Sequence, residues 1–336
     1  MRYVEGDILT KNGFQKGHIG ITKDGKIEYG NGSAPGKTIA KGIIVPTFIN
    51  AHTHIGDAFV KTKEIKLPRN VEKLVAPPNG LKHILLKTAS EEEIITGMKQ
   101  SIQDMIDSGI SSFCDFRENG IDGIYQIKTA LKNRKITSTI LSRPVQMNYN
   151  KEEVDLLLEN SDGIGLSSIS DWDYSEIEKI AKHTKQKKKR FILHASEAIR
   201  EDIDTILDLK PDFLIHMIKA TESDLIMVKE ENIPIVLCPR SNEFFHLKID
   251  MKLMKKSGVE LMLGTDNAMI NTPNILEEVH FLKNTTRIFS AKELLNMITY
   301  TPRKALNLDD CIQGLNLPSN VVVLEKKSLK QLYITK

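Results

Sequence analysis

The sequence contains few cysteines and no long apolar run. Cys114, Cys238 and Cys311 are the only cysteines in 336 residues and form no CxxC pair, which argues against a disulfide scaffold or a zinc knuckle and favours a reducing compartment. No run of about eighteen apolar residues occurs, and the N-terminus, MRYVEGDILTKNG, carries charges where a signal peptide needs its apolar core. We therefore expect a cytoplasmic protein with no membrane partner.

A strong excess of charge and a large aromatic surface are also missing. The net charge is only +3, and the one basic cluster, residues 182–190 (KHTKQKKKR), fits the end of a helix better than a nucleic-acid surface. Trp172 is the single tryptophan, so no broad aromatic platform for a nucleoside is evident. Because 40% of the residues are apolar and 27% are charged, we expect a globular protein with a large core and no nucleic-acid partner.

What the sequence does contain is a regular alternation of apolar β-type runs and helical patterns. The β-type runs are residues 42–50, 110–116, 136–142, 162–169, 190–196, 212–217, 233–238 and 259–264. The helical patterns include two capping boxes, Ser90 with Glu93 and Ser290 with Glu293. Such alternation is typical of βα units around a parallel sheet, and eight units make a barrel. The sequence thus predicts an α/β fold, a (β/α)8 TIM-type barrel over residues 43–318.

Both chain ends and one internal interval depart from this rhythm. Residues 1–42 alternate short β-type runs with glycine-containing turns, and VVVLEKK and QLYITK near the C-terminus have the same character. We expect residues 1–42 and 319–336 to form one small β-sheet domain beside the barrel. The interval 55–89 contains Pro68 and a PPNG sequence, fits no regular element, and is expected to fold over the mouth of the barrel as a lid.

Candidate metal ligands follow several of the predicted strands. His52 and His54 flank one residue at the end of the first strand, so their imidazoles point the same way. His194, His216 and Asp266 stand at the ends of the fifth, sixth and eighth strands, where barrel enzymes carry their catalytic groups. Imidazoles with one carboxylate suit zinc or ferrous iron and leave room for a bound water, which indicates a catalytic metal site.

The order of these motifs resembles that of the metal-dependent deaminases of the amidohydrolase superfamily, the group of cytosine deaminase, S-adenosylhomocysteine and methylthioadenosine deaminases, and the triazine hydrolases. The resemblance covers nearly the whole chain and rests on GIIVPTFINAHTH, HASE, LIH, CPRSN and LGTDN at the first, fifth, sixth, seventh and eighth strands. It implies the barrel fold and a divalent metal ion, with zinc favoured over iron. The ligands that it implies are His52, His54, His194 and Asp266.

The resemblance also implies the groups that move protons. It makes Glu197 of HASE the proton shuttle and His216 a partner of the attacked group. Asp266 can accept a proton from the metal-bound water, and protonated Glu197 can pass one to the ring nitrogen and then to the departing amine. Members with two metals carry a carboxylated lysine on the fourth strand, whereas DGIGLSSIS at 162–170 has no lysine. A single metal ion is therefore expected.

Substrate contacts are sought at the remaining strand ends. Arg117 and Arg143 follow the second and third strands, and Ser241 and Asn242 follow the seventh. Arginines at the mouth can bind a carboxylate, a phosphate or a ring oxygen, and a surface ion pair is the alternative for each. We expect these four residues to bind substrate.

Three functions are compatible with these residues. The leading hypothesis is hydrolytic deamination of an amino-substituted heterocycle, such as a purine, a pyrimidine or a related ring, by a metal-bound hydroxide. A chlorohydrolase or a cyclic amide hydrolase could use the same site, because the leaving group decides the reaction. A catalytically silent, ligand-binding barrel is the third. The expected partners are a small heterocyclic substrate and water, and assembly into a homo-oligomer is left open.

Overall fold

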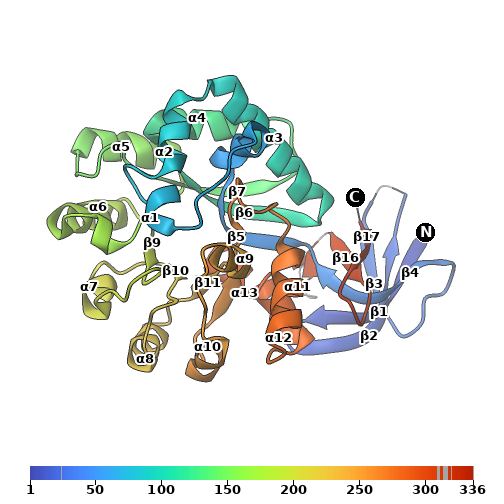
Figure 1. Ribbon diagram of the computed structural model, residues 1–336. Helices are drawn as coiled ribbons and strands as arrows, with labels where there is room; N and C mark the ends of the chain where they lie inside the picture. Colours follow the sequence, from blue (N-terminus) through green and yellow to red (C-terminus); the bar gives the residue numbers. More distant parts are fainter. Residues whose placement is uncertain (24, 309–310, 313–316, 319, 336) are drawn as a thin grey trace.

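The computed structural model describes residues 1–23, 25–308, 311–312, 317–318 and 320–335, with a curled parallel sheet inside a layer of helices (Figure 1). The sheet order is β12-β11-β10-β9-β8-β7-β6-β5-β13. Its strands are β5 (Phe48–His54), β6 (Ile110–Arg117), β7 (Thr137–Ser142), β8 (Gly163–Leu166), β9 (Arg190–Ala195), β10 (Leu214–His216), β11 (Ile235–Leu237), β12 (Leu261–Leu263) and β13 (Asp266–Asn267). The predicted α/β class is confirmed, and the curled parallel sheet is consistent with a TIM-type fold.

The segment that contains β12 and β13 contacts both edges of this sheet. β12 pairs in parallel with β11, and β13 pairs in parallel with β5, where Asp266 lies opposite Thr53. Between the two pieces, the amide of Thr265 donates a hydrogen bond to the carbonyl of His52. This segment therefore places Asp266 beside the histidines at the end of β5.

Helices cover the outer face of the sheet (Figure 1). They are α3 (Glu91–Asp107), α4 (Gly120–Leu131), α5 (Lys151–Asn160), α6 (Tyr174–Gln186), α7 (Ile203–Asp208), α8 (Glu222–Glu230), α9 (Pro239–Phe244), α10 (Met251–Ser257), α11 (Ile275–Thr285), α12 (Ala291–Asn296) and α13 (Tyr300–Ala305), with the short 3-10 helix η2 (Ile169–Asp171) after β8. Both predicted capping boxes are present, at the starts of α3 and α12. Among the described residues, none of these helices is long and apolar enough to cross a membrane.

The interval 55–89 does contain regular structure, so that part of the prediction is wrong. It forms the 3-10 helix η1 (Ile55–Lys63) and the helices α1 (Val71–Leu74) and α2 (Leu81–Thr88). Ile55, Phe59 and Val60 of η1 are buried, and the Asn70 side chain caps α1 by accepting a hydrogen bond from the amide of Lys73. Prolines between short helices concealed this pattern, because each helix is too short for a clear period. We call residues 55–89 the covering segment.

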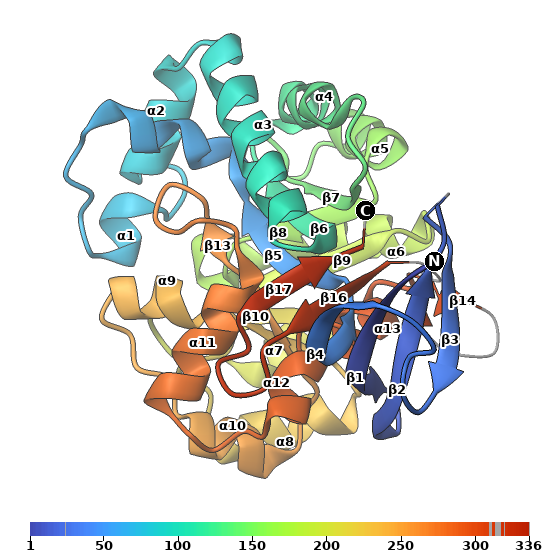
Figure 2. The ribbon, with the colours of Figure 1, turned by 90° about the vertical axis from the view of Figure 1, so that its right-hand side faces the viewer.

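A second sheet joins the two ends of the chain, as predicted (Figure 2). Its order is β17-β16-β4-β1-β2-β3, with β1 (Arg2–Thr10), β2 (Gly13–Ile21), β3 (Ile27–Asn31), β4 (Thr38–Pro46), β16 (Val321–Leu324) and β17 (Gln331–Ile334). The apolar run 42–50 holds the end of β4 and the start of β5, so this sheet extends past residue 42 to Pro46. Residues 319 and 336 of the predicted C-terminal part lie outside the described residues. A two-stranded sheet, β14 (Cys311–Ile312) with β15 (Leu317–Pro318), precedes β16.

Candidate metal centre

Two histidines at the carboxyl end of β5 and an aspartate at the start of β13 converge on one point. Nε2 of His52 lies 3.3 Å from Oδ1 of Asp266, and Nε2 of His54 lies 3.7 Å from the same oxygen. One ligand atom from each of the three residues lies within 4.8 Å of the others. This spacing suits a single cation held between them.

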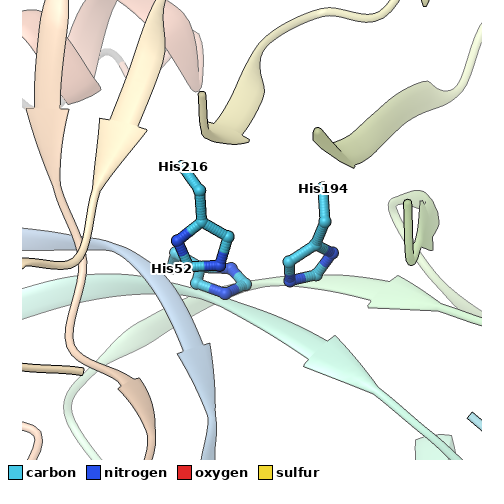
Figure 3. Close-up of side chains that lie close together, drawn as sticks. All are labelled: His52, His194 and His216. Carbon is cyan, nitrogen blue, oxygen red and sulfur yellow. The ribbon is translucent and has the colours of Figure 1, made fainter. Parts of the chain in front are cut away.

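Two further histidines reach the same point from β9 and β10. Figure 3 shows the rings of His52, His194 and His216 close together. The ring centroids of His52 and His194 are 4.9 Å apart, and those of His194 and His216 are 5.5 Å apart. Ligand atoms of these three residues also lie within 4.8 Å of one another. The structure therefore brings the sequence-predicted ligands together and places His216 among them.

Hydrogen bonds fix the orientation of two of these rings. Nδ1 of His54 lies 2.9 Å from Oε1 of Glu118, and Nδ1 of His194 lies 2.7 Å from the carbonyl oxygen of Leu166. Because both partners are acceptors, each Nδ1 carries the proton and each Nε2 keeps its lone pair. Burial, followed by the charge of Lys82, lowers the pKa of His54 to about 3, and burial lowers that of His194 well below its ordinary value. Both rings are thus neutral near pH 7, as metal binding requires.

His52 provides a test of whether a metal fits this site. Both of its ring nitrogens are buried, and neither makes a hydrogen bond to any residue that the structure describes. A buried polar atom without a partner is costly and calls for an explanation. A divalent cation would supply a partner to the nitrogen nearest Asp266, and imidazole with carboxylate is a donor set that zinc and ferrous iron accept. The residues present fit such an ion.

Asp266 is held by donors on both carboxylate oxygens. Oγ of Ser241 donates to Oδ2 at 2.5 Å, and Nδ2 of Asn267 donates to Oδ1 at 2.9 Å. Burial by itself raises the pKa of Asp266, but the neighbouring imidazoles, His52 above all, outweigh it and hold that pKa well below its usual range. The backbone φ angles are 59° at Asp266 and 75° at His216, a region that residues other than glycine rarely occupy. Such strain concentrates at functional sites.

A cavity of about 280 Å³ opens over these groups. His54, His194, His216 and Asp266 are part of its lining. The covering segment contributes Val71, Glu72, Val75, Ala76, Pro77, Lys82 and His83, which confirms that it folds over the mouth. The remaining lining residues are Glu118, Arg143, Ser167, Ser168, Ser170, Asp171, Glu197, Ala198, Ile199, Glu201 and Asn267. The cavity thus combines apolar walls with polar groups beside the candidate metal ligands.

Glu197 lies where this cavity meets the histidines. Its side chain is 11% exposed, and Oε1 lies 3.5 Å from Nε2 of His216. The same oxygen accepts a hydrogen bond of 3.4 Å from Nδ2 of Asn242 on α9. Burial, and then the charges of Asp266 and Asp171, raise the pKa of Glu197 well above its ordinary value. The raised pKa favours the protonated form of Glu197, which can donate a proton.

The residues expected to bind substrate divide into two groups. Arg143, just after β7, lines the cavity. Ser241 and Asn242 are 0% exposed and lie behind it, where Ser241 supports Asp266. Asn242 donates to Glu197 and to Nδ1 of His216, the latter at 3.4 Å.

Arg117 also lies away from the lining of this cavity. It is 2% exposed, and its guanidinium contacts Oδ2 of Asp115 at 3.2 Å and Oε2 of Glu118 at 2.5 Å. These two carboxylates pair with Nη1 and Nη2 of Arg117, the atoms that would otherwise bind a ligand. The observed position is that of a structural ion pair.

The sequence did not predict the contacts that two residues make near the metal centre. Glu118 contacts His54, and Lys82, 2% exposed on α2, lies 2.5 Å from Oε1 of Glu118. Glu118 follows the predicted strand 110–116, and this position is a usable signal, because strand ends carry functional groups in such folds. Lys82 had no such signal, since it lies in the covering segment and meets its partners only after folding.

Comparison with known proteins agrees with this geometry. The model of the amidohydrolase family matches residues 43–312. An uncharacterised protein of Methanocaldococcus jannaschii is 37% identical over 289 residues, which cover 80% of this chain and 75% of that protein. A 5-methylthioadenosine/S-adenosylhomocysteine deaminase of Thermoanaerobacter pseudethanolicus is 26% identical, with 96% of this chain and 80% of that protein covered.

Solved structures share the fold. A zinc-bound adenosine deaminase from Xanthomonas campestris superposes with a TM-score of 0.73 at 16% identity and covers 98% of this chain and 85% of its own. Helicobacter pylori aminofutalosine deaminase in complex with methylthio-coformycin also gives 0.73, at 14% identity, with 99% and 94% covered. The family match spans most of the chain and includes every histidine and aspartate described above. The chain therefore belongs to the amidohydrolase family.

Proposed function

We propose that this protein is a metal-dependent aminohydrolase that deaminates an amino-substituted heterocycle. The observation that carries the proposal is the placement of Glu197, a carboxyl group with a raised pKa, beside a cluster of imidazoles and the carboxylate of Asp266 at the base of a cavity. His52, His54, His194 and Asp266 would hold one divalent cation, zinc by preference. Hydrolysis of a ring–amine bond needs an activated water and a proton for the leaving nitrogen, and this site has groups for both.

The bound cation would supply Lewis acidity, because a coordinated water can lose a proton near pH 7. The protein supplies the acceptor for that proton. Asp266 is ionised and carries donors from Ser241 and Asn267, which hold its carboxylate in a fixed orientation toward the histidines. Asp266 therefore serves as the general base.

Glu197 and His216 act on the substrate side. Because the amide of Asn242 donates to Nδ1 of His216, the neutral ring carries its proton on Nε2, which faces Glu197. That proton leaves Nε2 without a lone pair for a metal, which favours His216 as a hydrogen-bond donor to the attacked group. Glu197 gives its proton to a ring nitrogen and, after receiving another, to the departing amine.

The cavity suggests what the substrate carries beyond the reacting ring. Arg143 lines it, and no carboxylate of the described residues comes within ion-pair distance of its guanidinium. An unpaired cation at a cavity wall favours a substrate with an anionic or carbonyl oxygen on that side. Val71, Val75 and Ile199 provide apolar surface for a ring. The volume of about 280 Å³ accommodates a small heterocycle.

The relatives support the same chemistry. Deaminases occur both among the sequence relatives and among the solved structures of this fold, and one of the latter binds zinc. Because the substrates of these relatives differ, the class of ring that this protein deaminates has to be determined by experiment.

The test is metal analysis of the purified protein together with ammonia release from a panel of aminated purines, pyrimidines, pterins and triazines. We expect close to one zinc or iron per chain and ammonia from one class of ring. Release of chloride, or ring opening, in place of ammonia would assign the chlorohydrolase or cyclic amide hydrolase activity to this site. A protein that takes up no divalent metal after reconstitution would contradict the proposal.

A further inference from the structure

Lys82 is a buried cation that the proposed mechanism does not use. It lies on α2 in the covering segment, is 2% exposed, and lines the cavity. Its Nζ lies 2.5 Å from Oε1 of Glu118, 2.9 Å from Oδ1 of Asn267 and 3.6 Å from Oδ2 of Asp57. Burying an ammonium is costly unless charges and acceptors surround it. Lys82 meets both conditions, and two of its three partners touch candidate metal ligands.

The first connection runs through Glu118 to His54. Oε1 of Glu118 contacts both Nζ of Lys82 and Nδ1 of His54, while Oε2 contacts Arg117. Two cations therefore hold this carboxylate in one orientation. In that orientation the carboxylate accepts a hydrogen bond from Nδ1–H of His54, and Nε2 of His54 is directed toward Asp266.

The second connection runs through Asn267 to Asp266. Because the ammonium of Lys82 can only donate, it fixes Oδ1 of Asn267 as the acceptor. The amide nitrogen must then face the other way, and it donates to Oδ1 of Asp266 at 2.9 Å. One cation thus orients both an imidazole and a carboxylate.

We propose that Lys82 is a positioning residue of the metal centre. Its ammonium holds Glu118 and Asn267 so that Nε2 of His54 and Oδ1 of Asp266 are directed toward the position of the metal ion. This inference rests on the proposed metal-dependent function. The inference also concerns the covering segment. This segment lines the cavity and carries Lys82, whose charge orients the metal ligands. The segment must therefore be docked before the ligands are fully oriented.

The test measures zinc affinity, which does not depend on knowing the substrate. Metal-free wild type, Lys82→Met and the matched control Lys87→Met, an exposed lysine on the same helix, are titrated with zinc against a chromophoric chelator. Loss of a group that orients a ligand weakens metal binding by roughly 10- to 100-fold. We expect that loss for Lys82→Met and an unchanged Kd for Lys87→Met. A folded Lys82→Met protein with the wild-type Kd, or an equal loss in the control, would overturn the proposal.

A second measurement covers the case in which the Lys82→Met protein does not fold because the buried charge of Glu118 lacks a partner. The double variant Lys82→Met/Glu118→Gln removes both charges of this pair and is compared with Glu118→Gln, and circular dichroism verifies the fold of each. Because Lys82 acts partly through Glu118, its replacement should weaken zinc binding less in the Glu118→Gln background than in the wild type. Equal losses in both backgrounds would rule out the route through Glu118. Wild type that binds zinc but releases no ammonia would reject deamination and leave this inference intact, whereas wild type that binds no zinc would reject both.

Discussion

Glu197 and Glu118 show how one site shifts the pKa values of two carboxyl groups in opposite directions. Burial and the nearby negative charges of Asp266 and Asp171 raise the pKa of Glu197. Burial acts on Glu118 in the same direction, but Lys82, His54 and Arg117 outweigh it and hold its pKa well below the usual range. Glu197 can therefore donate a proton, and Glu118 stays an acceptor that orients His54. Environment assigns the two roles.

Replacing Glu197 by glutamine should separate metal binding from turnover. Glutamine keeps the size and an acceptor for Asn242 but has no acidic proton. We expect an unchanged metal content and a kcat lowered by about 10²- to 10⁴-fold, the usual contribution of a general acid or base. Ammonia release and elemental analysis check the two expectations. Glu243→Gln, an exposed position next to Asn242 on α9, is the control, and retention of kcat in Glu197→Gln would remove Glu197 from the mechanism.

Arg143 should affect binding more than chemistry. Its guanidinium lines the cavity without a carboxylate partner among the described residues, so a substrate oxygen would be its main partner. A hydrogen bond to a charged group contributes about 1.5–3 kcal/mol, and we expect Arg143→Met to raise KM by roughly 10- to 100-fold with a smaller change in kcat. Steady-state kinetics with the identified substrate decide this. A fall in kcat at constant KM would place Arg143 in the proton-transfer machinery instead.

At the scale of elements, the covering segment carries a histidine that is buried in its neutral form. His83 is 7% exposed, and its Nε2 lies 3.0 Å from the carbonyl oxygen of Val75. Burial, followed by the charges of Arg143 and Lys82, lowers its pKa to about 4 from the ordinary 6.5. The unfolded chain therefore binds more protons at this residue between these pH values, and its contribution to stability is lost as the pH falls.

His83→Gln should reduce that loss, because glutamine can donate to the same carbonyl and does not titrate. Between pH 6.5 and about 4, the free energy of unfolding of the wild type should fall relative to the variant by at most about 1.4 kcal/mol per pH unit. Urea unfolding of both proteins at several pH values in this range provides the comparison. Parallel pH profiles would show that His83 is protonated in the folded protein.

The elements that the sequence predicted well are those whose signals are local. Apolar β-type runs located most of the parallel strands, and the capping boxes at Ser90 and Ser290 located two helices. The HxH spacing in a strand was enough to bring His52 and His54 to one point. The run 42–50 misled, because a continuous apolar stretch does not reveal that β4 ends at Pro46 and β5 starts in a different sheet.

The contacts that escaped prediction are those made only by folding. Glu118 meets His54 across 64 positions of sequence, and Lys82 meets Asn267 across 185. No periodicity links such residues, because their partners lie on separate elements. The same holds for Ser241 and Asn242. The sequence placed both at a strand end, but it did not predict their contacts with Asp266 and Glu197. The position of a residue at a strand end can be inferred from the local sequence. The direction of its side chain depends on contacts with distant residues and cannot.

For the whole molecule, the question is whether the end sheet and the parallel sheet form one cooperative unit. β16 separates two apolar clusters because its side chains alternate. Val322 and Leu324 belong to the main core with the barrel helices, and Val321 and Val323 belong to the core of the end sheet. β4 pairs with β16 and divides its side chains in the same way, with Val45 in the main core and Ile44 in the end sheet. Two strands thus serve both cores.

Shared strands should make the two parts unfold together, and the single tryptophan allows a direct test. Trp172 is 8% exposed in the main core after β8, so its fluorescence reports on the parallel sheet and its helices. Val323→Ala leaves a cavity in the end sheet, and we expect it to lower the free energy of unfolding measured at Trp172 by about 1–3 kcal/mol. Leu332→Ala, at a half-exposed position of β17, is the control and should change it little. If the Trp172 transition stays unchanged while circular dichroism detects earlier loss of strand structure, the end sheet unfolds as a separate domain and the predicted division of the chain gains its support.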